Sequence, residues 1–318
     1  MPCLRLFAFS SPLPTHPAAR RNTLPRNNSN NNRVISSPSN PFVKHCVKLR
    51  LSSSYRRSSR SAIVVGLTPI LEICRFRELE EWGFSLVDCL LLLDGCEIPD
   101  GFRDSSARIL RVSAHVMKKV SGLQSADSIE AVALIKFPSS FLDLNGDQEE
   151  ASCGAWFPSP QRILALDGIQ DPGNLGTLVR SAMAFKWDGV FLLPGCCDPF
   201  NEKALRAARG ASFQLPLVSG NWLHLEALRN RFEMKMLAGH PDDYSEKSER
   251  PLLSRELADS LTGMPLCLVL GSEGHGLSEK ALQVCELVSI PMVGMFESLN
   301  VSVAGGIFLF MLQPEHHP

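Results

Sequence analysis

The sequence predicts an α/β protein whose larger part is a parallel β-sheet with helices on both faces. After about residue 160, short apolar runs alternate regularly with segments of helix length. Strands separated in this way pair in parallel, because each crossover between them needs a connection of that length. Polar turns follow three of these strands, and ligand sites of parallel sheets lie at the carboxyl ends of the strands.

The positions of the apolar runs predict the elements of this part. Six strands are expected, at Arg162–Asp167, Gly189–Leu193, Leu215–Val218, Met234–Ala238, Leu266–Gly271 and Val288–Met292. Five helices are expected, at Asn174–Phe185, Glu202–Arg209, Trp222–Phe232, Ser278–Cys285 and Asn300–Leu312. Together they define a domain over residues 161–318.

A small α/β unit is predicted ahead of this domain, over residues 56–138. Its strands are expected at Ser61–Gly66, Leu86–Leu93, Arg108–Val112 and Ile129–Phe137. Its helices are expected over Thr68–Arg77 and from the cap Ser113 to Val120. The first helix has Thr68 as its N-cap and Pro69 at the first helical position, where a missing N–H costs nothing.

Two segments are expected to lie outside these units. Residues 139–160 contain Asn-Gly and Phe-Pro-Ser-Pro and predict a linker. Residues 1–71 carry 11 Lys and Arg and no acidic residue, whereas the remaining chain carries 21 basic and 33 acidic residues. The Ser-, Arg- and Asn-rich residues 1–55 therefore predict a disordered organellar transit peptide without a core. The alternative is a disordered basic tail that binds nucleic acid.

Composition excludes several classes. The chain is 44% hydrophobic and 20% charged, and no apolar run reaches the roughly 20 residues that span a bilayer, so no membrane partner is expected. The ten cysteines include no C-x-x-C pair, which argues against a zinc ribbon and favours reduced, buried thiols.

The first polar segment runs from Leu166 to Phe185. After the strand, Asp-Pro-Gly makes a turn, Asn174 is expected to cap the helix, and Arg180 follows two turns later. Taken by itself, this segment also fits an ordinary helix cap with a surface arginine.

The second segment is L-V-L-G-S-E-G-H-G-L-S-E. Its glycines, Gly271, Gly274 and Gly276, follow a buried strand and let backbone groups approach a ligand closely. Their spacing differs from the dinucleotide order and no Walker lysine is present, so nucleotide-phosphate binding is disfavoured. Glu273 is either a ligand or an ordinary loop carboxylate.

The third segment, Ile290–Ala304, joins a strand end to a glycine loop and a Ser-Leu-Asn turn that opens an apolar helix. Ser298 and Asn300 both stand where this helix begins, and either could cap it. The occurrence of all three segments in order distinguishes them from ordinary caps.

Together the segments resemble motifs 1, 2 and 3 of the SpoU family of RNA ribose methyltransferases, within the SPOUT superfamily, over about Arg162–Leu312. The resemblance implies a sheet whose C-terminal part forms a trefoil knot, although knots are otherwise nearly absent from proteins. It also implies S-adenosylmethionine bound in the knot, a homodimer, and an RNA-recognition domain similar to a small ribosomal protein over Tyr55–Phe137.

The resemblance carries roles onto residues of this chain. The expected catalytic residues are Asn174, Arg180, Glu273, Ser298 and Asn300. The expected cofactor-binding residues are Leu270, Gly271, Gly274, Gly276, Ile290, Met292 and Leu299. No metal is expected. The family's arginine is considered to activate the ribose 2′-hydroxyl, but arginine is a poor base because its pKa exceeds about 12. An electrostatic role is therefore expected for Arg180, stabilising the developing alkoxide and holding the adjacent phosphate.

Two departures from the family pattern stand out. Lys186-Trp187 follow Phe185 where relatives have a small and an acidic residue, and the chain ends soon after its last helix. The acidic balance of the body is also unusual for an RNA binder. Lys203, Arg206 and Arg209 are expected to form either a local basic face beside the site or an ordinary solvated helix surface.

The expected function is S-adenosylmethionine-dependent 2′-O-methylation of structured RNA, ribosomal rather than transfer RNA, by a plant organellar-type member of the family. The expected compartment is the chloroplast, with the mitochondrion as the alternative. Two other functions are considered, a catalytically silent RNA-binding or ribosome-assembly factor on the same fold and, more remotely, a nucleotide-binding oxidoreductase.

Overall fold

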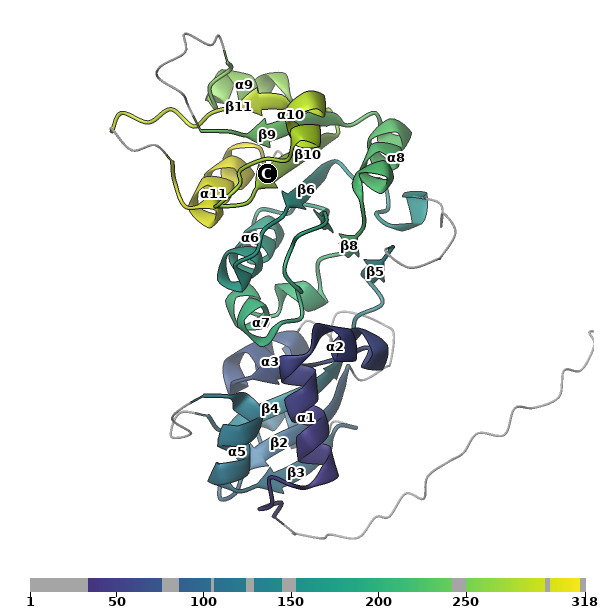
Figure 1. The fold of residues 1–318 in the computed structure, drawn as a ribbon, viewed down its shortest axis with the longest axis vertical. Coiled ribbons are helices and arrows are strands. Elements are labelled where there is room, and N and C mark those ends of the chain that lie inside the picture. Colours follow the sequence, from purple (N-terminus) through teal and green to yellow (C-terminus); the bar gives the residue numbers. More distant parts are fainter. Residues whose placement is uncertain are drawn as a thin grey trace, which may run out of the picture. The chain divides into compact units, whose positions relative to one another are not determined.

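The computed structural model describes residues 34–75, 86–103, 106–123, 129–144, 153–241, 250–294 and 298–314, and the transit-peptide prediction for residues 1–33 lies outside this part of the chain. A four-stranded sheet occupies the N-terminal portion, in the order β1-β4-β2-β3 (Figure 1). Its strands are β1 Ser61–Val65, β2 Val87–Leu93, β3 Arg108–Val112 and β4 Ala131–Lys136. Strand β4 pairs antiparallel with β1 and β2, while β2 and β3 pair in parallel. All four strands agree with the sequence prediction.

Helices cover both faces of this sheet. They are α1 Pro41–Leu51, α2 Ser53–Ser59, α3 Leu67–Arg75, α4 Asp100–Arg103 and α5 Ala114–Ser121. Helices α1 and α5 share one apolar cluster with alternate residues of the strands, and α3 and α4 contribute to the cluster on the opposite face. Ser113 caps α5 by accepting a hydrogen bond from the Val116 N–H, as predicted.

The prediction that residues 1–55 lack a core is wrong from residue 41 onward. Asn40 caps α1, and Pro41 occupies the first turn. Val43, Cys46 and Leu49 recur at every third position and are fully buried against the sheet. The apolar residues of this segment are interleaved with Lys44, Lys48 and Arg50, and the helix is stabilised by the sheet beneath it rather than by its own sequence alone.

A second sheet has seven strands in the order β11-β9-β10-β6-β7-β8-β5, and every pair is parallel. Its strands are β5 Phe141–Asp143, β6 Arg162–Asp167, β7 Gly189–Leu192, β8 Leu217–Ser219, β9 Lys235–Gly239, β10 Leu266–Gly271 and β11 Glu286–Val288. The predicted parallel sheet is confirmed. Strand β11 ends four residues earlier than expected. The predicted linker is not free of regular structure: it contains β5, which pairs with β8 of the sheet, and the 3-10 helix Cys153–Ala155.

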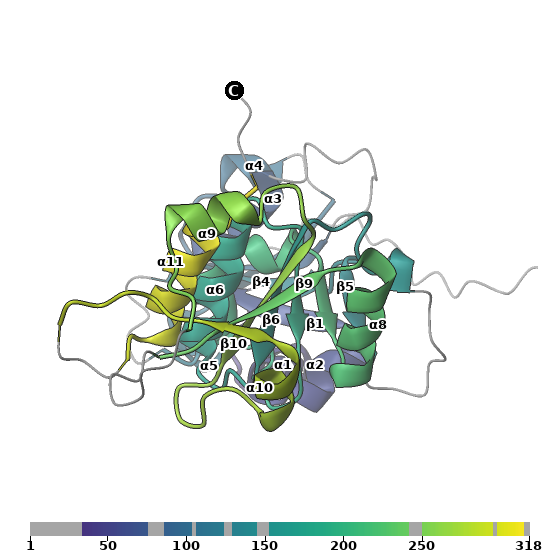
Figure 2. The ribbon, with the colours of Figure 1, turned by 90° about the horizontal axis from the view of Figure 1, so that it is seen from above.

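Helices lie on both faces of the larger sheet, as predicted. They are α6 Pro172–Ala184, α7 Glu202–Ala208, α8 Trp222–Phe232, α9 Arg255–Ser260, α10 Glu279–Val284 and α11 Val301–Met311. Side chains of β6 alternate between the faces: Leu164 and Leu166 meet α6, whereas Ile163 and Ala165 belong to the cluster of α8 and α10. Figure 2 shows α6, α9 and α11 on one side of the strands and α8 on the other. Helix α9 was not predicted.

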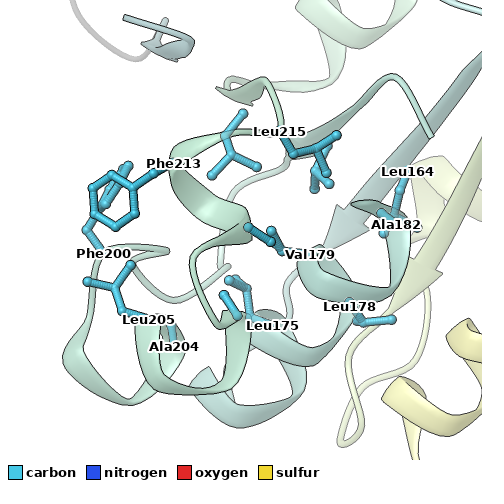
Figure 3. Close-up of a cluster of buried hydrophobic side chains, with 14 of the residues drawn as sticks. Leu164, Leu175, Leu178, Val179, Ala182, Phe200, Ala204, Leu205, Phe213 and Leu215 are labelled. Atoms are coloured by element: carbon cyan, nitrogen blue, oxygen red, sulfur yellow. The ribbon is translucent and has the colours of Figure 1, made fainter. Parts of the chain in front are cut away.

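Helices α6 and α7 approach each other closely. Their apolar side chains interdigitate, with Leu175 and Val179 of α6 beside Ala204 and Leu205 of α7 (Figure 3). The approach needs a glycine at 176, since a Cβ there would lie 2.2 Å from the Ala204 carbonyl oxygen. In the part of the chain that the structure describes, no helix is long and apolar enough to cross a membrane.

We expect the folded protein to begin before α1 rather than after residue 55. A chain that starts at Val34 should unfold at the same denaturant concentration as the full chain. A chain that starts at Arg56 should lose at least about 3 kcal/mol, because burial of the α1 side chains contributes about 1.5–3 kcal/mol each. Denaturant unfolding followed by circular dichroism measures both. Equal stability of the two shortened chains would contradict this assignment.

Candidate functional site

A cavity of about 590 Å³ lies where β9 and β10 end, at the edge of the sheet that the sequence predicts for a ligand. Four pieces of chain enclose it: the ends of these strands, the glycine-rich turn after β10, residues 290–292, and the start of α11. The residues of the second and third segments that line it are Leu270, Gly271, Ser272, Glu273, His275, Gly276, Leu277, Ile290, Met292, Ser298, Leu299, Asn300, Val301 and Ala304.

The glycine-rich turn is a tight hairpin. Ser272 and Gly276 exchange two backbone hydrogen bonds of 2.9 Å, and Gly276 has a φ of +66°. A Cβ on Gly271 would lie 2.4 Å from the Gly276 carbonyl carbon, so this glycine is required by the chain's own close approach rather than by a ligand. A Cβ on Gly274 would meet no atom within 4 Å, and Gly274 is not among the cavity-lining residues, so the cofactor-binding role expected for it stays a prediction.

The third segment provides the opposite wall. Asn300 is the N-cap of α11, and its Oδ1 accepts hydrogen bonds from the N–H and the hydroxyl of Ser302, at 2.9 and 2.6 Å. Ser298 does not cap the helix, and it lines the cavity with an exposed side chain. Residues 295–297 lie outside the described part of the segment.

No residue of the first segment lines the cavity, and Asn174 contacts the cavity wall through Glu273. The predicted capping role of Asn174 is wrong, because Asp171 caps α6 by accepting a hydrogen bond from the Asn174 N–H at 2.8 Å. The Asn174 side chain is thereby free to donate to Glu273 Oε1 in the hairpin. The fold thus brings Asn174 and Glu273 together, and Glu273 in turn lines the cavity.

Arg180 stands apart from this group. It is exposed on α6 and does not line the cavity, and its side chain forms no hydrogen bond or ion pair with any residue in the described ranges. The expected basic face beside it is weakened, since Arg206 pairs with Glu202 and Arg209 with Glu72. Only Lys203 of that group is left without a carboxylate partner among the described residues.

Two residues near the cavity were not anticipated from the sequence. Asp167, at the end of β6, is buried and accepts a hydrogen bond from the Ser278 N–H at 2.8 Å, which fixes the chain after the hairpin. His240 follows β9 and lines the cavity. Asp167 is the last residue of β6 and His240 the first residue after β9, and this place at the carboxyl end of a parallel strand is the signal that could have identified them.

The thiols of Cys196 and Cys285 are poor nucleophiles. Burial raises the pKa of Cys196 to about 11 and that of Cys285 to about 12, so both remain protonated near neutral pH. Within the described ranges, no three His, Cys, Asp or Glu side chains are placed to hold a metal ion. The polar side chains that line the cavity are hydroxyl, carboxylate, amide and imidazole groups, from Ser272, Glu273, Ser298, Asn300, His240 and His275.

Residues 161–310 match the SpoU rRNA Methylase family. The chain is 31% identical over 190 residues to the 23S rRNA (guanosine(2553)-2′-O)-methyltransferase RlmP of Bacillus subtilis, covering 59% of this chain and 71% of that protein. It superposes on an RNA 2′-O ribose methyltransferase with a TM-score of 0.66 and 25% identity, over 88% of this chain and 98% of the other. The AdoMet-bound rRNA methyltransferase of Sinorhizobium meliloti shares the fold, with a TM-score of 0.68, 22% identity, and 88% and 97% of the chains covered.

We expect Gly271 and Gly274 to differ in how far substitution by alanine destabilises the protein, although the sequence predicts the same role for both. Gly271→Ala should destabilise the protein by about 1–3 kcal/mol, because the added Cβ overlaps the Gly276 backbone. Gly274→Ala is the control, since a Cβ there meets nothing, and it should change stability by less than about 0.5 kcal/mol. Urea unfolding of both variants measures the difference, and equal effects would rule out the steric explanation.

Proposed function

The chain belongs to the SpoU rRNA Methylase family, and on this premise we propose that it transfers a methyl group from S-adenosylmethionine to a ribose 2′-hydroxyl of structured RNA, ribosomal rather than transfer RNA. One observation carries the proposal: the second and third segments, which carry the family resemblance, jointly wall a cavity of about 590 Å³. That volume falls within the range of roughly 300–1,000 Å³ that small-molecule sites occupy.

The cavity walls fit the cofactor. Of the seven residues expected to bind it, six line the cavity: Leu270, Gly271, Gly276, Ile290, Met292 and Leu299. Their side chains give apolar surface for an adenine ring, and the irregular backbone around the hairpin offers polar groups that a nucleoside can bond. S-adenosylmethionine, when bound, supplies an activated methyl group on a sulfonium, so the protein needs chiefly to position the acceptor oxygen.

We assign the acceptor side of the site to polar groups at the cavity mouth. Ser298 and Asn300 line the cavity at the start of α11, where the helix N-terminus favours negative charge. Glu273 is held by Asn174 in the opposite wall. The buried thiols remain protonated, so they do not serve as the base that removes the 2′-hydroxyl proton.

We further propose a homodimer that closes on α11. Val303, Ile307 and Phe310 form an apolar stripe on this helix and are 53%, 36% and 55% exposed. Their spacing places them on one helix face. Exposed apolar stripes of this kind favour a partner, and a second copy is the simplest one because a two-fold axis pairs the stripe with itself.

The dimer also gives Arg180 a place in the reaction. Leu178 contacts Gly305 and Phe185 contacts Phe310, so α6 runs in the same direction as α11 and Arg180 lies level with the middle of the stripe. Because Arg180 lies outside the cavity of its own chain, we assign it to the RNA at the cavity of the second copy. There its guanidinium would hold a phosphate and stabilise the developing alkoxide.

Three further features belong to the proposal: the knot, the RNA-recognition domain and the organellar leader. The passage of the chain from β11 at the sheet edge to α11, which packs on β9 and β10, supports a trefoil knot in the C-terminal part. The four-stranded sheet with its helices has the size and class of a small RNA-recognition domain. The acid-free composition of residues 1–33 supports an organellar leader, and we propose the chloroplast as the compartment, with the mitochondrion as the alternative.

We expect Arg180→Ala to separate binding from transfer. The variant should bind S-adenosylmethionine as the wild type does, while methyl transfer to RNA falls by about a hundred-fold or more. Arg231→Ala, which removes an exposed arginine of α8, should leave both unchanged. Calorimetry measures cofactor binding, and label transfer to organellar rRNA measures activity. The proposed function would be wrong if the wild-type protein neither bound S-adenosylmethionine nor transferred its methyl group to RNA.

We expect the apolar stripe to control the oligomeric state. Val303→Glu with Phe310→Glu should convert the protein to monomers, because each buries a charge in the proposed interface. Leu223→Glu is the matched control, since Leu223 is 73% exposed on α8 away from the stripe, and it should leave the dimer intact. Light scattering after gel filtration measures the mass. A monomeric wild type, or dimeric stripe variants, would show that α11 is not the interface.

A further inference from the structure

The basic N-terminus is divided between a leader and a folded surface. Of the 11 Lys and Arg in the acid-free residues 1–71, six lie in residues 41–71, which form α1, α2, β1 and the start of α3. A targeting sequence therefore accounts for fewer than half of these charges. The charges that belong to folded helices need a separate explanation.

Helix α5 continues the same pattern beyond the acid-free stretch. It lies beside α1 across one face of the four-stranded sheet (Figure 1). Between them the two helices carry five cations and no carboxylate, namely Lys44, Lys48, Arg50, Lys118 and Lys119. Residues that turn inward on both helices belong to one apolar cluster, so the four lysines are left on the outer surface. We call this surface the α1–α5 face.

The cations of the α1–α5 face lack neutralising partners. None of the four lysines forms an ion pair with any residue that the structure describes, although Lys48 lies 5.6 Å from the centre of the Tyr55 ring. Asp88 of β2 acts electrostatically on His45 of α1, an effect that by itself raises the pKa of His45. His45 adds no charge, because burial lowers its pKa despite the opposing effect of Asp88.

Arg50 marks the seam between the two helices. Its guanidinium lies so close to Gly122, the C-cap of α5, that a Cβ on Gly122 would come within 2.1 Å of Arg50 Nη1. Its Nε is buried and has no hydrogen-bond partner in the described structure. A buried guanidinium N–H without an acceptor is costly, and an anion bound at the seam would stabilise it.

We propose that the α1–α5 face is the surface on which the protein holds the phosphate backbone of its RNA substrate. The inference rests on the proposed function for the nature of the substrate, and it adds where the RNA lies. Lysine is a mobile point charge suited to phosphates whose spacing varies along a folded RNA. The surface of α7 with Lys203, Arg206 and Arg209 is the alternative place for the RNA backbone. Two of these three cations, Arg206 and Arg209, are already paired with carboxylates.

The experiment measures how RNA affinity depends on salt. Each phosphate contact contributes about 0.7–0.9 to the slope of log K against log salt concentration. Replacement of Lys44, Lys48, Lys118 and Lys119 by Gln should therefore reduce the slope by about 3 and weaken binding at least about tenfold. The probe is a labelled hairpin RNA, and fluorescence anisotropy is recorded over a series of KCl concentrations.

Two variants control for charge and for folding. The double variant Lys118→Gln, Lys119→Gln is compared with the double variant Arg229→Gln, Arg231→Gln. The second removes an equal charge from exposed residues of α8, and it should leave the salt slope of RNA binding unchanged. Replacement of the four lysines by Arg keeps the charge and should keep binding.

Cofactor affinity separates this inference from the proposed function. All variants should bind S-adenosylmethionine as the wild type does, and failure of the wild type to bind it would count against the methyltransferase assignment instead. A four-lysine variant with the wild-type salt slope would overturn the inference, and would leave the face to an acidic protein partner. The inference would also be overturned if the α8 control variant weakened RNA binding as much as the lysine variants do.

Discussion

The site depends on how closely α11 is seated on the sheet. A Cβ on Gly305 would lie 2.3 Å from Leu178 of α6 and 2.8 Å from Leu270 of β10, and a Cβ on Gly239 would lie 2.9 Å from the Phe308 ring. Glycine at both positions lets the helix lie directly against β9, β10 and α6. Because the start of α11 forms a wall of the cavity, any shift of this helix changes the cavity itself.

Polar contacts fix the far end of the same helix. Arg162 is 6% exposed, and its guanidinium donates hydrogen bonds to three backbone carbonyls. These belong to Leu312 at the end of α11, Leu261 at the end of α9 and Met264 just before β10. Burial lowers the pKa of Arg162, partly offset by Asp188, but an arginine remains charged in spite of this. A cation at two helix C-termini is favourably placed with respect to both helix dipoles. The helix is therefore held by packing in its middle and by a buried charge at its end.

Much of this arrangement follows from local sequence, and the failures have physical causes. Apolar runs locate nearly every strand of both sheets, because helices cover both faces of each sheet and strands buried on both faces carry continuous hydrophobic sequence. Strand β5 was missed because its three residues, Phe141–Asp143, are stabilised by pairing with β8 rather than by their own pattern. The cap of α6 was misplaced because Asp171 and Asn174 are both good capping residues, and only the backbone conformation decides between them. Strand order also could not be derived: β6 and β10 are adjacent, which is why Asn174 meets a glutamate 99 positions away.

The distribution of charge explains how a chain with a net charge of −1 can suit an RNA substrate. Electrostatic interactions between exposed groups are screened beyond about 10 Å at 0.1 M salt. An RNA backbone on the α1–α5 face therefore responds chiefly to the charges near it, which include the five cations of that face and Asp88. The acidic balance of the whole is thus no obstacle to phosphate binding on one surface. The same reasoning makes helix α1 part of the functional protein, since it supplies three of the five cations as well as the apolar contacts that hold them in place.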